Sequence, residues 1–245
     1  MRLTRVYVDA PLGVGLMVEL PEHAAAHLVR VLRLREGDVC VLFNGNGHDY
    51  DARITSIGKR GVQVEVSSAR RIDNESPLSI TLLQGIARGE KMDLILQKAT
   101  ELGVTRIIPV HSDRSEVKLE GARSIKRLAH WRGVVASACE QSGRATLPEV
   151  NEPAPLLSAV GAAGLPVARY TLSPLAEGGI DSVTVANENQ LLIAVGPEGG
   201  WSERDLQTLD NAGFIGLRLG PRILRTETAG LAAIAALQMR LGDMR

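Results

Sequence analysis

The sequence predicts an α/β protein in which a small β-rich module precedes a larger domain of alternating strands and helices. In residues 1–72, short stretches alternate apolar and polar residues, the pattern of half-buried strands. From residue 73 to 245, apolar runs of strand length alternate with amphipathic runs of helix length. Such alternation is typical of a mostly parallel sheet covered by helices. The polar, proline-ended stretch 70–77 fits a linker between the two domains.

The N-terminal module contains four strand-like stretches and one helical one. Residues 5–10 and 61–66 alternate cleanly, and residues 39–58 predict two strands around a turn. The turn is NGNG at 44–47, where glycine and asparagine tolerate positive φ. The stretch 21–38 predicts a short helix that ends at Gly37.

The larger domain predicts a repeating order of strand and helix. Met92, Ile95, Ala99 and Leu102 form one apolar stripe, as expected for an amphipathic helix. Ser202 with Asp205 predicts a capping box at another helix start. The expected strands are 78–86, 106–110, 167–172, 191–195 and 215–220, and the expected helices are 90–104, 122–140, 202–213 and 228–242. Ligands of such folds bind at the carboxyl ends of the strands.

Composition excludes several classes of protein. With 44% hydrophobic and 23% charged residues, the chain has the balance of a soluble globular protein. No apolar run is long enough to span a bilayer, and the N-terminus lacks the apolar core of a signal peptide. We therefore expect a cytoplasmic protein without membrane contact. Cys40 and Cys139 are too far apart for a CxxC pair, and His23 with His27 has no third ligand nearby, so no metal site is expected.

Formal charge is zero in total but unevenly distributed. Residues 86–144 carry a net charge of +4, residues 145–217 one of −7, and residues 218–245 one of +3. This segregation fits a basic face for nucleic acid, and it also fits a mixed solvated surface. Only 3% of residues are aromatic, which argues against a wall of base-stacking rings.

The loop VGPEGG (195–200) is the first candidate binding segment. It follows a predicted buried strand and precedes a capped helix, and its glycines allow the backbone to approach a ligand closely. Its spacing matches neither common phosphate-binding motif, and the carboxylate of Glu198 would repel a phosphate. A cationic or hydroxyl-rich ligand such as S-adenosylmethionine fits better. A purely structural glycine turn is the alternative.

The second candidate segment is LGPRILRTETA (219–229). It also links a predicted strand to a helix, and Gly220 with Pro221 forces a turn. Arg222, Arg225 and Glu227 crowd one turn beside apolar neighbours. Such a loop can hold an adenine through backbone groups and present charge to a substrate. Thr226 or Glu227 can instead serve only as a helix cap.

Four motifs together carry a family resemblance: KATELGV (98–104), CEQSGR (139–144), VGPEGG and LGPRILRTETA. Their combination resembles the SPOUT-class methyltransferases that modify N3 of a uridine in bacterial small-subunit ribosomal RNA. RVYV at 5–8 and HLVRVLRLREGD at 27–38 resemble the PUA-like RNA-binding module of that family. The resemblance covers nearly the whole chain in the expected order.

The resemblance implies a catalytic α/β domain with a trefoil knot, a PUA-like β-barrel at the N-terminus and a homodimer with the pocket near the subunit interface. The cofactor, S-adenosyl-L-methionine, would lie in three loops. The implied cofactor contacts are Leu172, Ser173, Gly196, Pro197, Glu198, Gly199, Gly200, Leu219, Gly220, Ile223, Leu224 and Thr226. The partner would be ribosomal RNA or the small ribosomal subunit.

Methylation at N3 of uridine requires removal of a weakly acidic proton from a base that is unpaired or flipped out. Glu227 is the candidate general base, and Arg225 or Arg144 could stabilise negative charge on the uracil oxygens. The rival interpretations are that Glu227 caps a helix or pairs with an arginine and that Arg144 binds RNA phosphate. Candidate RNA contacts are Arg2, Arg5, Arg30, Arg33, Arg35, Lys91 and Lys98.

Three other functions stay open from the sequence. A SPOUT methyltransferase could act on another RNA, such as transfer RNA ribose. An RNA-binding assembly factor could retain the pocket without catalysis, in which case neither S-adenosylmethionine nor its demethylated product need bind. A nucleotide-phosphate-binding protein would bind ATP or NAD instead.

Overall fold

The structure, a computed structural model, describes residues 4–59, 61–117, 119, 121–185 and 189–244. The chain divides into two compact units. The first comprises Met1–Glu75 with Ala136–Leu147, and the second comprises Ser76–Val135 with Pro148–Arg245. No local pattern in the sequence indicates that residues 136–147 associate with the N-terminal module. The boundaries 1–72 and 73–245 therefore remain a prediction.

The N-terminal unit is built on a five-stranded sheet in the order β1-β3-β4-β5-β2. Its strands are β1 (Arg5–Tyr7), β2 (Met17–Glu19), β3 (Val39–Phe43), β4 (His48–Gly58) and β5 (Gly61–Arg71). β1 is parallel to β3 and the other pairs are antiparallel. NGNG forms the β3–β4 turn as predicted, with positive φ at Gly45 and Gly47. Among the described residues, β1 and β2 form the two edges of the sheet and do not pair with each other. The predicted closure into a barrel is therefore not present as strand pairing.

The helix of this unit is shorter than predicted. α1 (Glu22–Ala26) continues directly into the π-helical turn η1 (His27–Val31), and the helix ends well before Gly37. Arg33 has a φ of 58°, a left-handed conformation that ends helices. The backbone N–H of Leu34 then turns back to donate to the carbonyl of Leu28 at 3.0 Å. This early helix end could not be predicted from the sequence, because a left-handed backbone at an arginine is rare.

The prediction that Arg5 contacts RNA is not supported, because its side chain is buried inside the N-terminal unit. The guanidinium donates to Asp49 at 2.6 Å and to the carbonyls of Cys139 and Arg144 at 2.7 and 3.1 Å. It also lies 4.4 Å from the centre of the Phe43 ring. A guanidinium whose donors are committed to protein acceptors cannot reach a phosphate. Arg5 instead joins the sheet to the end of the long helix.

The second unit contains a parallel sheet in the order β12-β10-β11-β6-β7-β8, with β9 also pairing with β7. Its strands are β6 (Ser79–Gly85), β7 (Val104–His111), β8 (Glu149–Val150), β9 (Ala154–Pro155), β10 (Ala168–Leu172), β11 (Gln190–Val195) and β12 (Ile215–Leu217). The prediction of a mostly parallel sheet is confirmed. The strand order reverses where β11 returns to lie beside β6, so a crevice is expected at the carboxyl ends there.

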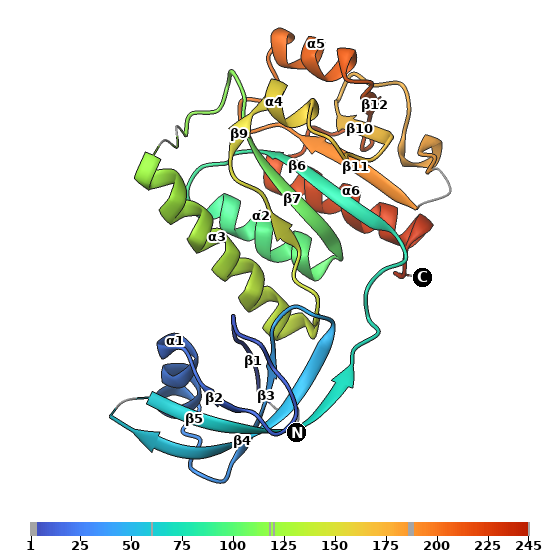
Figure 1. The fold of residues 1–245 in the computed structure, drawn as a ribbon. Coiled ribbons are helices and arrows are strands. Elements are labelled where there is room, and N and C mark those ends of the chain that lie inside the picture. The colour runs from blue at the N-terminus through green and yellow to red at the C-terminus, as the bar shows by residue number, and fades with distance from the viewer. Residues whose placement is uncertain (1–3, 60, 118, 120, 186–188, 245) are drawn as a thin grey trace. The chain divides into compact units, whose positions relative to one another are not determined.

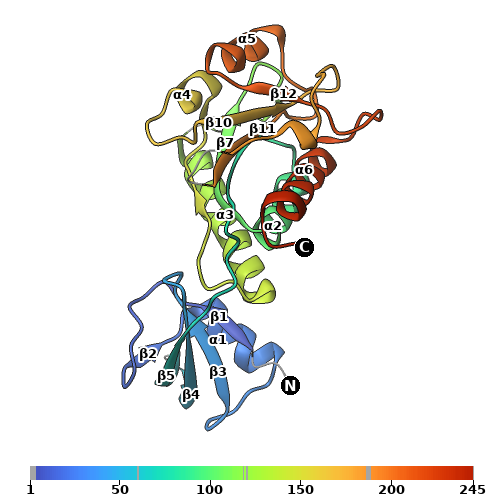
Figure 2. The ribbon, with the colours of Figure 1, turned by 90° about the vertical axis from the view of Figure 1, so that its right-hand side faces the viewer.

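Helices cover both faces of this sheet (Figures 1 and 2). They are α2 (Glu90–Glu101), α3 (Gly121–Ser142), α4 (Leu156–Val160), α5 (Glu203–Asn211), α6 (Thr226–Leu241) and the 3₁₀ turn η2 (Ile180–Ser182). α2 packs beside α6, and α4 packs beside α5. The last turns of α3, from Ala136, belong to the N-terminal unit.

The side chains of β6 show how the two faces are filled. Ile80 and Leu82 enter the apolar core shared with α2 and α6, whereas Leu83 enters the core shared with α4 and α5. Alternating residues of β11 divide in the same way. A strand buried on both faces reads as a continuous apolar run, which is why β6 and β11 are recognisable in the sequence.

The remaining departures from prediction concern short elements and boundaries. β2, β8, β9 and α4 were not predicted, since they have only two to five residues and too little periodicity. β5 runs on to Arg71, which pairs with His48, so the unstructured link begins at Ile72. β12 ends at Leu217, three residues before Gly220. No described helix is long and apolar enough to cross a membrane.

Candidate functional site

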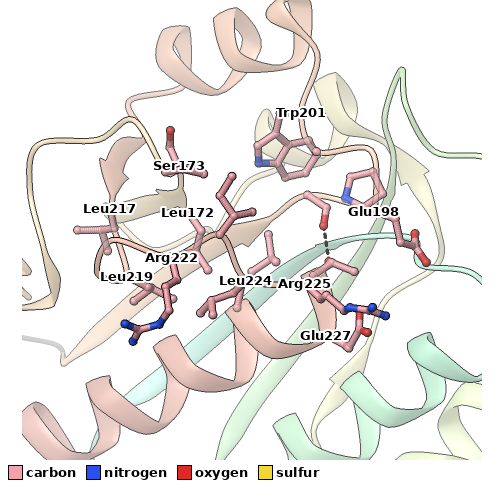
Figure 3. Close-up of a pocket in the computed structure, with 18 of the residues that line it drawn as sticks. Leu172, Ser173, Glu198, Trp201, Leu217, Leu219, Arg222, Leu224, Arg225 and Glu227 are labelled. Carbon is pink, nitrogen blue, oxygen red and sulfur yellow. Dashed lines mark hydrogen bonds between the residues drawn. The ribbon is translucent and has the colours of Figure 1, made fainter.

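A cavity of about 620 Å³ opens at the carboxyl ends of β10, β11 and β12 (Figure 3). That volume is in the range of small-molecule sites. Apolar side chains make most of its walls, and charged groups gather near the start of α6. The lining residues are Lys91, Leu172, Ser173, Pro174, Leu175, Val195, Gly196, Pro197, Glu198, Gly200, Trp201, Leu206, Leu217, Leu219, Gly220, Arg222, Ile223, Leu224, Arg225, Thr226, Glu227 and Ala229.

The VGPEGG loop turns sharply after β11. Gly200 has a φ of 68°, and its N–H donates to the carbonyl of Pro197 at 2.8 Å. A Cβ on Gly196 would lie 3.2 Å from the Gly200 backbone, so a side chain there would force the turn apart. The predicted capping box of Ser202 and Asp205 is confirmed and fixes the start of α5 immediately after the loop.

Gly85, at the end of β6, lies directly against this loop. A Cβ at Gly85 would be 2.5 Å from Pro197 Cδ and 2.6 Å from its backbone nitrogen. No real Cβ approaches backbone so closely. The strand and the loop can therefore meet only because position 85 has no side chain.

We expect Gly85→Ala to lower the free energy of unfolding by about 1–3 kcal/mol, since the overpacked methyl must displace backbone. Urea unfolding measures the change. Gly133→Ala is the matched control, because position 133 lies within α3 and its Cβ would meet nothing within 4 Å. That control should be neutral or slightly stabilising. A Gly85→Ala protein as stable as the parent would contradict the close approach.

The loop from 218 to 225 forms the opposite wall. The Arg218 N–H donates to the carbonyl of Gly178, and the Arg225 carbonyl accepts from Thr228 and Ala229. The residues between them are neither helix nor strand, so regular ladders do not use their backbone groups, which can pair with a ligand. Neither Thr226 nor Glu227 caps α6, whose N-cap is Arg225 without a side-chain hydrogen bond. The Thr226 hydroxyl instead donates to the carbonyl of Gly196 at 2.5 Å, and the buried Gln84 amide donates to that hydroxyl at 3.3 Å. This chain of bonds joins β6, the VGPEGG loop and α6.

One ammonium and two carboxylates lie at the charged end of the pocket. Lys91 Nζ is 3.4 Å from Glu198 Oε1 and 3.8 Å from Glu227 Oε2. Glu198 also accepts a hydrogen bond from the N–H of Arg88 at 3.1 Å. Partial burial opposes ionisation of Glu198, but the bond from Arg88 and the nearby Lys91 outweigh it, so its pKa is lowered. The carboxylate is therefore ionised at neutral pH.

These residues fit S-adenosylmethionine. Leu172, Leu217 and Leu219 offer apolar surface for a flat purine ring. Glu198 and Glu227 give the charged end of the pocket carboxylates suited to a sulfonium or an ammonium. The same carboxylates disfavour a nucleotide phosphate, as the sequence suggested.

Comparison with known proteins agrees with this geometry. An RNA methyltransferase domain family matches residues 74–238, and an RNA methyltransferase PUA domain family matches residues 20–67. A ribosomal RNA small subunit methyltransferase E from Buchnera aphidicola is 32% identical, covering 99% of this chain and 98% of the relative. The enzyme of that name from Bacillus subtilis is also 32% identical, over 89% and 88% of the two chains.

The chain belongs to the ribosomal RNA small subunit methyltransferase E family. A crystal structure of a ribosomal RNA small subunit methyltransferase E from Neisseria gonorrhoeae, bound to S-adenosylmethionine, has a TM-score of 0.92. It is 42% identical, and the similarity covers all of both chains. The predicted family and the PUA-like nature of the N-terminal module are thus confirmed.

The structure of this RNA methyltransferase brings nearly all the predicted cofactor residues together. Every one of them lines the pocket except Gly199. The Gly199 carbonyl accepts a hydrogen bond from Arg114 at 3.1 Å, and its Cα packs against the Arg114 side chain. That these lining residues contact the cofactor remains a prediction.

Several lining residues were missed by sequence reasoning. Trp201 is buried, and its indole N–H donates to Thr171 at 3.1 Å, fixing the ring in the pocket wall. Its place directly after Gly200 was the available signal. Pro174 and Leu175 follow a strand end in the same way, so the carboxyl-end rule could have found them. The other residues missed are Leu206 and Leu217, whereas Val195, Arg222 and Ala229 lie within the two predicted segments without having been named as cofactor contacts.

The candidate catalytic residues separate into two groups. Glu227 and Arg225 line the pocket and lie near each other in Figure 3. Arg144 does not line it. Its guanidinium is buried in the N-terminal unit and pairs with Glu75 at 2.5 Å. Because Arg144 is not in this pocket, the structure does not support the prediction that it stabilises charge on the uracil. Because its side chain is buried, the structure does not support the rival interpretation, contact with RNA phosphate, either.

The candidate RNA-binding residues have different environments. Arg30, Arg33 and Arg35 are exposed on the N-terminal unit and stay predictions. Lys98 pairs with Glu101 at 2.9 Å on the surface of α2, whereas Lys91 lines the pocket. Arg2 lies outside the described residues. Among the residues that the structure describes, no group of histidine, cysteine or acidic side chains could hold a metal ion.

Proposed function

We propose that this protein uses S-adenosylmethionine to methylate N3 of a uridine in small-subunit ribosomal RNA. The observation that carries the proposal is the pocket itself, in which the VGPEGG loop and loop 218–225 face each other around carboxylates suited to a cation. The ribosomal RNA target is supported by the names of relatives aligned over nearly the whole chain. The choice of uridine N3 rests on the family resemblance of the sequence.

The chain's own residues supply what this reaction needs. S-adenosylmethionine, when bound, provides an activated methyl group. Glu227 is the candidate acceptor of the N3 proton, since its carboxylate lines the pocket and is mostly buried. Arg225, exposed at the start of α6, is the candidate partner for negative charge on the uracil oxygens. The apolar walls hold the cofactor so that the reacting atoms align.

The RNA would be held by the exposed arginines of the N-terminal unit. Arg30, Arg33 and Arg35 follow one another around the end of η1, and a cluster of guanidinium groups suits phosphates. The target base must leave its stack or come from an unpaired region, because N3 lies on the pairing edge. Action on ribosomal RNA also fits a cytoplasmic location.

Two finer structural features belong to the same proposal. A trefoil knot is supported by the crowding of β6, the VGPEGG loop and the start of α6 at Gly85, Pro197 and Thr226. A homodimer is supported by Leu175 and Ile223, which line the pocket yet are 93% and 84% exposed. Large apolar side chains at a pocket rim suit coverage by a second copy.

Mass spectrometry of ribosomal RNA nucleosides tests the function. Cells lacking the protein should lose 3-methyluridine from small-subunit RNA, and the wild-type chain should restore it. Loss of a different methylated nucleoside would favour another RNA target. Calorimetry separates the remaining alternatives: binding of neither S-adenosylmethionine nor its demethylated product would indicate a non-catalytic assembly factor.

A further inference from the structure

Lys91 has a position that its predicted role as a phosphate contact does not explain. It stands in the first turn of α2, and its ammonium lies between carboxylates from two other elements. Glu198 comes from the loop after β11, and Glu227 from the first turn of α6. Charges from three elements far apart in the sequence thus meet at one edge of the pocket.

The two carboxylates are held differently. Glu198 accepts a hydrogen bond from the backbone of Arg88 as well as lying near Lys91. Glu227 Oε2 is buried and has no hydrogen-bond partner among the described residues. Lys91 Nζ, at 3.8 Å, is close enough for ion pairing but too distant for a hydrogen bond. The Lys91 ammonium therefore stands beside an oxygen of Glu227 that the protein covers and that no hydrogen bond satisfies among the described residues.

We propose that Lys91 is a positioning residue that orients the Glu227 carboxylate at the pocket by ion pairing with its Oε2 atom, with Glu198 anchoring the ammonium. This inference rests on the proposed function. In the reaction one proton passes from N3 to Glu227, and one methyl group passes from the cofactor to N3. The cofactor loses its positive charge as Glu227 loses its negative charge, so the net charge of the site is preserved.

The surroundings of Lys91 favour this role over phosphate binding. Lys91 lies within ion-pair distance of two carboxylates, so its charge is already compensated and it attracts a phosphate less than a free lysine would. Arg225 lines the pocket on the same element as Glu227, and Arg88 precedes α2 and donates its backbone N–H to Glu198. The Arg88 side chain pairs with Glu116, so it is directed to another carboxylate. Lys91 is therefore the cation within ion-pair distance of Glu227 among the described residues.

The deciding comparison is Lys91→Met against Lys91→Arg in the full-length protein, with Lys59→Met as the control. Methionine keeps an unbranched chain of similar length and removes the charge, whereas arginine retains the charge. Lys59 is an exposed lysine at the β4–β5 turn, so its change tests general loss of surface charge. Single-turnover methylation is measured from pH 5 to about pH 9 at saturating RNA and cofactor.

We expect Lys91→Met to slow methylation about tenfold or more at neutral pH, even with RNA and cofactor saturating. The rate falls because the Glu227 carboxylate loses the cation that holds it in place. Lys91→Arg should retain most of the rate. A Glu227→Gln background should abolish the effect of Lys91→Met, as expected when one residue acts through the other.

A second readout does not depend on turnover. Calorimetry should give the same affinity for S-adenosylmethionine and for RNA in Lys91→Met as in the parent. An unchanged single-turnover rate, with weaker RNA binding alone, would overturn the inference and restore the phosphate role. If the parent itself neither binds S-adenosylmethionine nor methylates ribosomal RNA, the proposed function fails instead.

Discussion

Glu227→Gln should lower the single-turnover rate of methylation by about 100-fold or more while leaving affinity for S-adenosylmethionine nearly unchanged. Glutamine preserves the shape of the side chain but cannot accept the N3 proton as a base. Because Glu227 Oε2 has no hydrogen-bond partner among the described residues, the substitution should not break a hydrogen-bond network. The effect should therefore fall on chemistry rather than on folding.

Single-turnover kinetics at several pH values and calorimetry with S-adenosylmethionine measure the two halves of this prediction. Glu203→Gln provides the control, because Glu203 is an exposed glutamate in the first turn of α5 and does not line the pocket. If Glu227→Gln and the parent have the same rate at every pH, Glu227 is not the general base. A large loss of cofactor affinity would assign it to binding instead.

Arg5→Met should lower the free energy of unfolding by about 3 kcal/mol. The side chains of Arg5 and Asp49 are only 6% and 4% exposed, and removal of the guanidinium leaves a buried carboxylate without its main partner. Arg70 still lies 3.0 Å from Asp49, which places the expected loss at the lower end for a broken buried pair. The carbonyls of Cys139 and Arg144 also lose a donor.

Urea unfolding followed by circular dichroism gives the measurement, and Arg70→Met gives the matched control. The Arg70 side chain is 51% exposed, so its ion pairs are screened by water and their loss should cost less than about 1 kcal/mol. Equal, small losses for the two variants would contradict a structural role for Arg5. Weakened RNA binding by Arg5→Met without loss of stability would return Arg5 to the RNA-binding residues.

The two candidate arginines that the structure buries, Arg5 and Arg144, show where sequence reasoning stops. Arg5 and Arg144 stand in segments typical of an RNA-binding family, and an arginine in a sequence looks the same whether it faces water or protein. Their partners, Asp49 and Glu75, are 44 and 69 residues away along the chain. Burial at that separation depends on folding of the whole N-terminal unit, including residues 136–147.

Lys91 illustrates a residue whose type was visible in the sequence but whose neighbours were not. Its type and position in the first turn of a helix were visible in the sequence, as were Glu198 and Glu227. Their meeting depends on the strand order, because β6, β11 and β12 bring three loops to one edge of the sheet. Likewise, Gly85 reads as an ordinary strand end until Pro197 is seen against it.

By itself, the sequence determined the α/β class, the long strands and helices, the NGNG turn, the capping box and the two loops that form the pocket. These features are local: hydrophobic periodicity, turn chemistry and capping act over a few residues and leave readable patterns. Tertiary structure alone decided which charged side chains are buried, which carboxylate lies beside which cation, and where a glycine is obligatory. Those outcomes depend on distances between segments remote in the chain, which no local pattern encodes.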